Sequence, residues 1–156
     1  MSKASRIGWK PQNYEARVAS ARIRCLNTIR ELRALKFPVE LYKERHESAY
    51  KAVVFSKAYT DKDIAIAERL KSRGTIVVFD LCDNHFLLAS ERVARLRKMF
   101  DLADHWVVSS EALAAVVRRS FTTVKPLWVI EDAVEEVLRG PLLDVVGWLK
   151  ARRQLI

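Results

Sequence analysis

The sequence contains only four glycines among its 156 residues, and they lie far apart, at positions 8, 74, 140 and 147. Dinucleotide-binding G-x-G-x-x-G turns and P-loops both need clustered glycines, because the backbone there must approach phosphate closely. Both types of site are therefore excluded. The sequence also lacks H-E-x-x-H and G-x-S-x-G, so neither motif-bearing zinc proteases nor hydrolases with that nucleophile turn are indicated.

Cysteines and long apolar runs are also scarce. Cys25 and Cys82 are the only cysteines, too few for a disulfide framework and without the spacing of a zinc site. No apolar run reaches the roughly 18–20 residues of a membrane span. The first residues, Met1–Arg6, lack the apolar core of a signal peptide. These absences predict a reduced, cytoplasmic protein, with peripheral contact to a membrane as an option.

Basic residues exceed acidic ones, with 28 Lys and Arg against 19 Asp and Glu, a formal net charge of +9. Such a charge favours anionic partners, which include nucleic acid, a membrane surface and phosphorylated small molecules. It does not choose among them, and a generally basic, solvated surface is an equal alternative. Because half of the residues are hydrophobic, the chain can form one globular domain with its own core.

Short β-rich runs alternate with amphipathic helical stretches along the chain. Runs such as Val53–Phe55 and Ile76–Phe79 are apolar without alternation, which is typical of parallel strands covered on both faces. The pattern predicts an α/β fold, a doubly wound, Rossmann-like three-layer sandwich around a parallel sheet of five or six strands. The expected strands are Arg6–Lys10, Val39–Lys43, Ala52–Lys57, Thr75–Asp80, His105–Ser109 and Leu127–Glu131. Among them we expect five buried side chains, Val53, Phe55, Val77, Phe79 and Val107.

The helices are marked by apolar stripes and by capping residues. A long first helix is predicted from about Glu15 to Leu35. Thr60 followed by Asp63 resembles a capping box, and Gly74 ends the helix that it opens. A third helix is predicted from about Ser90 to Ala103, and a fourth begins after Ser109 and Ser110. The link at 44–51 is short for a crossover helix, so it holds a single helical turn or Val39–Lys43 is an edge strand.

Polar side chains follow three of the predicted strands. In an open α/β sheet, ligands bind outside the carboxyl ends of the strands, where the strand order reverses. The loops concerned are residues 11–17, 56–59 and 81–86, and the last is the most polar. Asp83, Asn84 and His85 together suit hydrogen bonding to a hydroxyl-rich ligand. The alternative is that Asp83 and Asn84 only cap and turn the chain.

Other residues admit a functional and a structural interpretation. Arg22 and Arg24, near the start of the first helix, could meet phosphate or belong to a solvated basic face. Cys82 is better interpreted as a buried thiol than as a nucleophile. Trp9, Trp106 and Trp128 lie in or beside strands, where we expect core packing for all three.

Four segments, in matching order and spacing, resemble a known family. They are Tyr50–Lys57, Thr75–Asp80 followed by His85, Phe100–Leu113 and Val129–Glu135. The third is the closest match, with a helix ending in Ala-Asp, then a strand, then S-x-x-L. Together they resemble the amino-terminal, acceptor-side domain of GT-B-fold glycosyltransferases, in particular the retaining group that uses nucleotide-sugar donors.

The resemblance implies a hexosyltransferase-type activity that needs no metal or other cofactor. It implies a sugar-containing acceptor, with phosphate- and lipid-linked forms included, and makes nucleic acid a less favoured partner. His85 or Asp83 would be the catalytic residue that orients the acceptor hydroxyl. The residues that would bind substrate are Asn13, Arg22, Lys57 and Asn84. In this family the nucleotide-sugar is held largely by a second domain, so we expect the isolated chain to depend on a second polypeptide or to be inactive.

Residues 1–135 are therefore predicted to form the glycosyltransferase-like domain, and residues 136–156 a helical tail. Pro141 can begin a helix in which Leu142, Val145, Val146 and Leu149 form an apolar stripe. The tail either covers the domain's own surface or docks on a partner. The rival to the glycosyltransferase hypothesis is a non-enzymatic, flavodoxin-like binding or regulatory module, with nucleic acid or another polyanion as its ligand.

Overall fold

A computed structural model describes residues 6–122 and 125–133, so the predicted tail at 136–156 lies outside the described residues. Six parallel strands form one sheet in the order β2-β1-β3-β4-β5-β6. The strands are β1 (Arg6–Pro11), β2 (Val39–Leu41), β3 (Tyr50–Ser56), β4 (Ile76–Leu81), β5 (His105–Val108) and β6 (Leu127–Val129). The predicted parallel sheet is confirmed, and β2 is a short edge strand.

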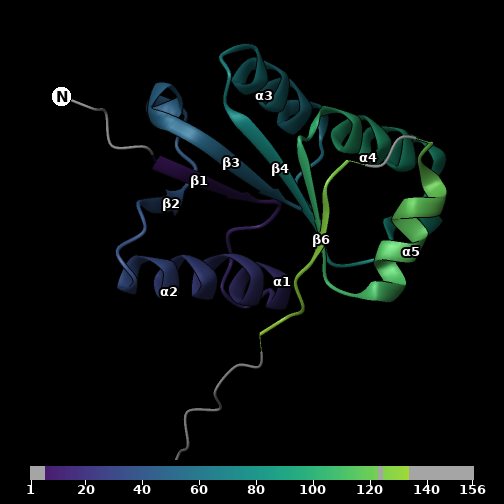
Figure 1. The fold of residues 1–156 in the computed structure, drawn as a ribbon, viewed down its shortest axis with the longest axis horizontal. Coiled ribbons are helices and arrows are strands. Elements are labelled where there is room, and N and C mark those ends of the chain that lie inside the picture. Colours follow the sequence, from purple (N-terminus) through teal and green to yellow (C-terminus); the bar gives the residue numbers. More distant parts are fainter. Residues whose placement is uncertain (1–5, 123–124, 134–156) are drawn as a thin grey trace, which may run out of the picture.

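Helices cover both faces of this sheet (Figure 1). One face carries a continuous helical segment, made of α1 (Ala19–Ala21), η1 (Arg22–Asn27) and α2 (Thr28–Ala34). The other carries α3 (Asp61–Ser72), α4 (Ser90–Leu102) and α5 (Glu111–Ser120). Two short 3₁₀ turns, η2 (Glu44–Ala49) and η3 (His85–Leu87), follow β2 and β4. The chain therefore has the predicted α/β, Rossmann-like three-layer architecture.

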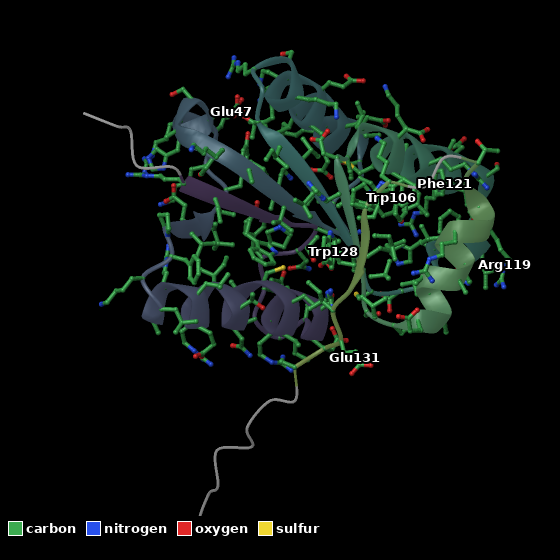
Figure 2. The ribbon with its side chains drawn as sticks, in the orientation of Figure 1. Glu47, Trp106, Arg119, Phe121, Trp128 and Glu131 are labelled. Atoms are coloured by element: carbon green, nitrogen blue, oxygen red, sulfur yellow. The ribbon has the colours of Figure 1, made fainter. Side chains whose placement is uncertain are left out.

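The main core lies between the sheet and helices α3–α5. Val53, Phe55, Val77 and Phe79 are fully buried there, as predicted. Phe100 packs edge-on against Trp106, whose indole nitrogen donates a hydrogen bond of 2.8 Å to the Phe100 carbonyl. Trp106 and Phe121 lie together on this side of the sheet (Figure 2).

Two expected core residues point to the opposite face. Side chains alternate along a strand, so Val107, between the buried Trp106 and Val108, faces the side of α1 and α2 and is only half-buried. Trp128 lies opposite Val107 in the register of β5 and β6 and is 59% exposed. The predictions that Val107 is buried and that Trp128 packs in the core are therefore wrong.

The first helix begins later than predicted, at Ala19 rather than Glu15. The Asn13 side chain accepts a 2.7 Å hydrogen bond from the backbone nitrogen of Glu15, which turns the chain. Val18 is still extended, so regular helix can start only after it. The middle of the helical segment, η1, is a π-helix, a form that occurs often at functional sites.

Helices α3 and α5 begin where their capping residues predict. Thr60 and Asp63 form the predicted capping box, and Gly74, with φ of +77°, follows the end of α3. Ser110 caps α5 by accepting a hydrogen bond from the backbone nitrogen of Leu113. In the described part of the chain, every helix is too short or too polar to cross a membrane.

Glu40, in β2, should give the fold a dependence on acid pH. Although burial raises the pKa of this carboxyl, hydrogen bonds from His46 and Tyr50 lower it to about 2. A carboxylate whose pKa is depressed by folding adds stability above its unfolded pKa, about 4.3, and loses it as the pH falls toward 2. We expect Glu40→Gln to lower the free energy of unfolding by about 1–2 kcal/mol at pH 7 and to flatten its decline below pH 4.

Urea unfolding between pH 2.5 and 7 measures this difference. Glu31→Gln is the matched control, since Glu31 is exposed on α2 and pairs with its exposed neighbour Arg30. Equal pH profiles for wild type and Glu40→Gln would contradict the prediction.

Candidate binding crevice at the carboxyl edge of the sheet

The strand order reverses between β1 and β3. The chain leaves β1 toward the helices on one face and leaves β3 toward α3 on the other, so a crevice opens between the carboxyl ends of these two strands. Backbone hydrogen bonds hold its floor together. Gln12 donates to the Ser56 carbonyl over 2.9 Å, and Lys57 donates to the Asp80 carbonyl over 2.8 Å.

Two adjoining pockets occupy this crevice. The larger, of about 320 Å³, lies between the ends of β1 and β3 and the start of the first helix. It is lined by Pro11, Gln12, Asn13, Val18, Ser20, Ala21, Cys25, Ser56 and Lys57. The smaller, of about 90 Å³, is lined by Gln12, Lys57, Tyr59, Thr60, Arg92 and Arg95. Gln12 and Lys57 line both pockets, so the two adjoin, and together we call them the switch-point crevice.

Lys57 is the centre of the crevice and has an unusual backbone. Its φ is +54°, in the left-handed region that residues other than glycine rarely adopt. Its ammonium group forms an ion pair with the Asp83 carboxylate. Burial lowers the pKa of Lys57, but the hydrogen bond to Asp83 and the electrostatic effects of Cys82, Asp83 and Tyr59 together outweigh burial, and the pKa is raised overall. The same hydrogen bond from Lys57 lowers the pKa of Asp83, so both groups are charged at neutral pH.

His85 lies beside this ion pair. Its Nδ1 is 2.8 Å from the Tyr59 hydroxyl, and its Nε2 is 3.8 Å from an Asp83 oxygen. Burial lowers the pKa of His85, and the positive charges of Lys57 and Arg92 lower it further. The imidazole is therefore neutral at pH 7, and in the tautomer that carries its proton on Nδ1 it can accept a proton at Nε2. Tyr59 lines the smaller pocket, whereas His85 is not among that pocket's lining residues.

The structure brings together most, but not all, of the residues predicted to form a site. Asn13 and Lys57 line the larger pocket. Asp83 pairs with Lys57 and His85 contacts Tyr59, but neither Asp83 nor His85 is among the lining residues of either pocket. Arg22 instead donates a 2.8 Å hydrogen bond to the Ala16 carbonyl and is not among the lining residues of either pocket. The Asn84 side chain accepts a hydrogen bond from the backbone nitrogen of Phe86, as the structural alternative predicted.

Arg24 has a structural role that the sequence did not reveal. Its side chain is buried, and its Nε lies 3.0 Å from each carboxylate oxygen of Asp80. Another nitrogen, Nη1, donates to Asp132 over 2.7 Å and to the Ile130 carbonyl over 3.0 Å. Arg24 is thus neither a free phosphate ligand nor part of a solvated face. Its ion pair ties the first helix to β4 and to the chain that leaves β6.

No protein-family model matches the chain, and no curated protein matches it. The resemblance to GT-B glycosyltransferases therefore depends on the four sequence segments alone, and the chemistry of the crevice is the remaining observation that bears on function.

Gln12 and Tyr59 lie in the predicted loops at 11–17 and 56–59, although neither was named as a site residue, whereas Arg92 and Arg95 lie outside all three predicted loops. The two arginines lie three residues apart near the start of α4, and this spacing puts them on the same side of the helix. A search of the sequence for two basic residues three positions apart, in the helix that follows a strand, would have found them. No local sequence pattern marks Tyr59 as a site residue, because its role follows from its contact with His85 in the folded chain.

Burial affects the reactivity of both cysteine thiols. Burial is the main cause that raises the pKa of Cys25 to about 11 and of Cys82 to about 12. Both are protonated at neutral pH and therefore poor nucleophiles.

Within residues 6–122 and 125–133, no group of three or more His, Cys, Asp or Glu side chains could hold a metal ion. The crevice instead offers amides, hydroxyls and cations, a set suited to a hydroxylated, anionic small molecule.

Proposed function

We propose that this chain is a glycosyltransferase-like domain that binds a glycosyl acceptor in the switch-point crevice. The acceptor is a polyhydroxylated molecule that carries a phosphate group. One observation carries the proposal: at the reversal of strand order, a single crevice combines hydrogen-bonding groups at one end with three cationic side chains, Lys57, Arg92 and Arg95, at the other.

The larger pocket suits the sugar part of such a ligand. Gln12, Asn13 and Ser20 supply amide and hydroxyl groups, which donate to and accept from sugar hydroxyls. Val18 and Ala21 supply apolar surface on which the carbon face of a sugar ring can rest.

The smaller pocket suits the phosphate. Lys57 and Arg92 contribute positive charge to it. Arg95 is held only loosely elsewhere, since its nearest carboxylate oxygen, on the exposed Asp61, is 3.7 Å away. A phosphate can therefore compete for it at small cost.

The chemistry would take place at the border of the two pockets. We assign His85 and Asp83 to orient the acceptor hydroxyl, with the neutral imidazole able to hold the hydroxyl proton. By resemblance, a second domain would hold most of the nucleotide-sugar donor. The isolated chain would then bind acceptor without transferring sugar.

Arg92→Gln should weaken binding of glucose 1-phosphate, the probe we choose, by about tenfold. A charge-assisted hydrogen bond contributes roughly 1.5–3 kcal/mol, and solvent exposure of Arg92 reduces this toward the lower limit. Isothermal titration calorimetry measures the affinity. Lys98→Gln is the matched control, because Lys98 lies on the same helix but pairs with Glu68 and is among the lining residues of neither pocket.

The choice of probes separates this function from its rivals. Glucose tests the hydroxyl contacts, inorganic phosphate tests charge alone, and duplex DNA in a salt titration tests a polyanion binder. The proposal predicts that glucose 1-phosphate binds more tightly than either of its parts. Tight DNA binding with a steep salt dependence, unchanged in Arg92→Gln, would favour the nucleic-acid alternative.

A further inference from the structure

An apolar pocket separate from the switch-point crevice is lined in part by the Arg24–Asp80 ion pair. Its volume is about 330 Å³, and it opens on the sheet face that carries α1 and α2. Trp9, Val54 and Val78 stand in register on β1, β3 and β4 and contribute to its lining, together with Val107 of β5. Ile23 and Thr28 of the first helix line it as well.

The same face continues as exposed apolar surface beyond this pocket. Trp128 is 59% exposed, Ile130 is 56% exposed and Ile76 is 44% exposed. Side-chain alternation places Trp128 and Ile130 on this face, because Leu127 and Val129 pack against the main core. Figure 2 shows Trp128 on the side of the sheet that faces the first helix, away from Trp106 and Phe121.

The exposure of these apolar side chains is unusual for a parallel sheet. Parallel sheets occur almost only with both faces covered, and large exposed apolar patches mark surfaces that bind something. In the described part of the chain, β3, β4 and β5 are covered by α3, α4 and α5 on one face, whereas the first helix reaches only part of the other. The uncovered face therefore calls for a further apolar element.

We propose that residues 134–156 of this chain are the element that docks on this exposed apolar face. Ala133, the last described residue, itself lines the pocket, so the segment that follows starts at its mouth. The sequence pattern of 141–153 predicts an amphipathic helix, with its apolar stripe at Leu142, Val145, Val146 and Leu149. A helix that returns across the face after the last strand would complete the third layer of the sandwich.

Covalent connection favours this occupant over a second copy of the chain. A segment that begins at the pocket meets it at a high effective concentration, whereas a second copy must lose translational and rotational freedom to bind. The anchor is also rigid, because Arg24 binds the Ile130 carbonyl and the Asp132 carboxylate just before the segment starts.

Photocrosslinking of the full chain tests the occupant directly. With p-benzoylphenylalanine in place of Trp128, we expect crosslinks within one chain to peptides from 134–156. The same reagent in place of Arg119, which lies on the outer side of α5 (Figure 2), should give none. Crosslinks between two chains would identify a second copy as the occupant and overturn the proposal, and so would the absence of crosslinks to 134–156.

A pair of substitutions in the full chain gives an independent test. Leu149→Asp places a charge in the apolar stripe, so it should lower the melting temperature by several degrees and speed hydrogen exchange in β6. Ala151→Asp lies on the opposite side of the predicted helix and should change neither quantity. Equal effects of the two substitutions would overturn the proposal, and a shift from dimer to monomer in Leu149→Asp would do so as well.

Discussion

Arg24→Met is expected to lower the free energy of unfolding by about 3–5 kcal/mol, because it leaves the Asp80 carboxylate buried without its counter-charge. Both side chains are more than nine-tenths buried, and three contacts of 2.5–3.0 Å join them. Ser56 also donates a 2.6 Å hydrogen bond to Asp80, but one neutral hydroxyl cannot replace a guanidinium. The loss of stability is measured by urea denaturation at pH 7.

A double substitution shows whether the unpaired charge is the cause. Arg24→Met combined with Asp80→Leu removes both charges, and it should recover most of the lost stability, since buried ion pairs replaced by apolar residues are often neutral in energy. Arg30→Met is the control, because Arg30 is exposed and its ion pair with Glu31 is exposed as well, so the substitution should change stability by less than about 0.5 kcal/mol. A loss below about 1 kcal/mol for Arg24→Met alone would show that the pair does not support the fold.

Lys57→Gly should separate ligand binding from stability. Glycine adopts positive φ readily, so the substitution relieves the left-handed backbone of Lys57, which costs roughly 1–2 kcal/mol in other residues. The lost ion pair costs less, because more than half of the Asp83 side chain is exposed to water. The free energy of unfolding should therefore stay the same or rise.

The same substitution should weaken the binding of glucose 1-phosphate by about 10- to 150-fold, since it removes the one cation that lines both pockets. Lys57→Gln keeps the backbone strain and should bind as poorly while being less stable than Lys57→Gly. If Lys57→Gly binds like the wild type, the crevice is not the ligand site. If it unfolds much more easily, Lys57 has a structural role.

The sequence predicted the helices and strands correctly wherever the local residue pattern and the tertiary packing favour the same structure. Unbroken apolar runs predicted the buried strands β3 and β4, and capping residues placed the starts of α3 and α5. Trp128 shows the limit of this reasoning. An aromatic residue in a strand indicates burial on average, but which face it occupies depends on the register with β5, and whether that face is covered depends on segments elsewhere in the chain.

The candidate site was predictable in its position but only partly in its residues. The rule of strand-order reversal located the edge of the sheet, and with it Asn13 and Lys57. Arg24 was missed because its partner Asp80 is far away in sequence, and nothing local distinguishes a buried arginine from a solvated one. Gln12 lay within the predicted loop at 11–17 but was not named as a site residue, because its importance comes from lining both pockets of the folded chain.

The location of the ligand is the most direct test of the proposed acceptor site. Titration of glucose 1-phosphate into the ¹⁵N-labelled chain, followed by amide chemical shifts, reports which segments the ligand contacts. The proposal predicts saturable shifts in residues 11–13, 56–60 and 90–95, around the switch-point crevice. Shifts confined to residues 127–133, or weak shifts spread over basic residues across the whole surface, would contradict it.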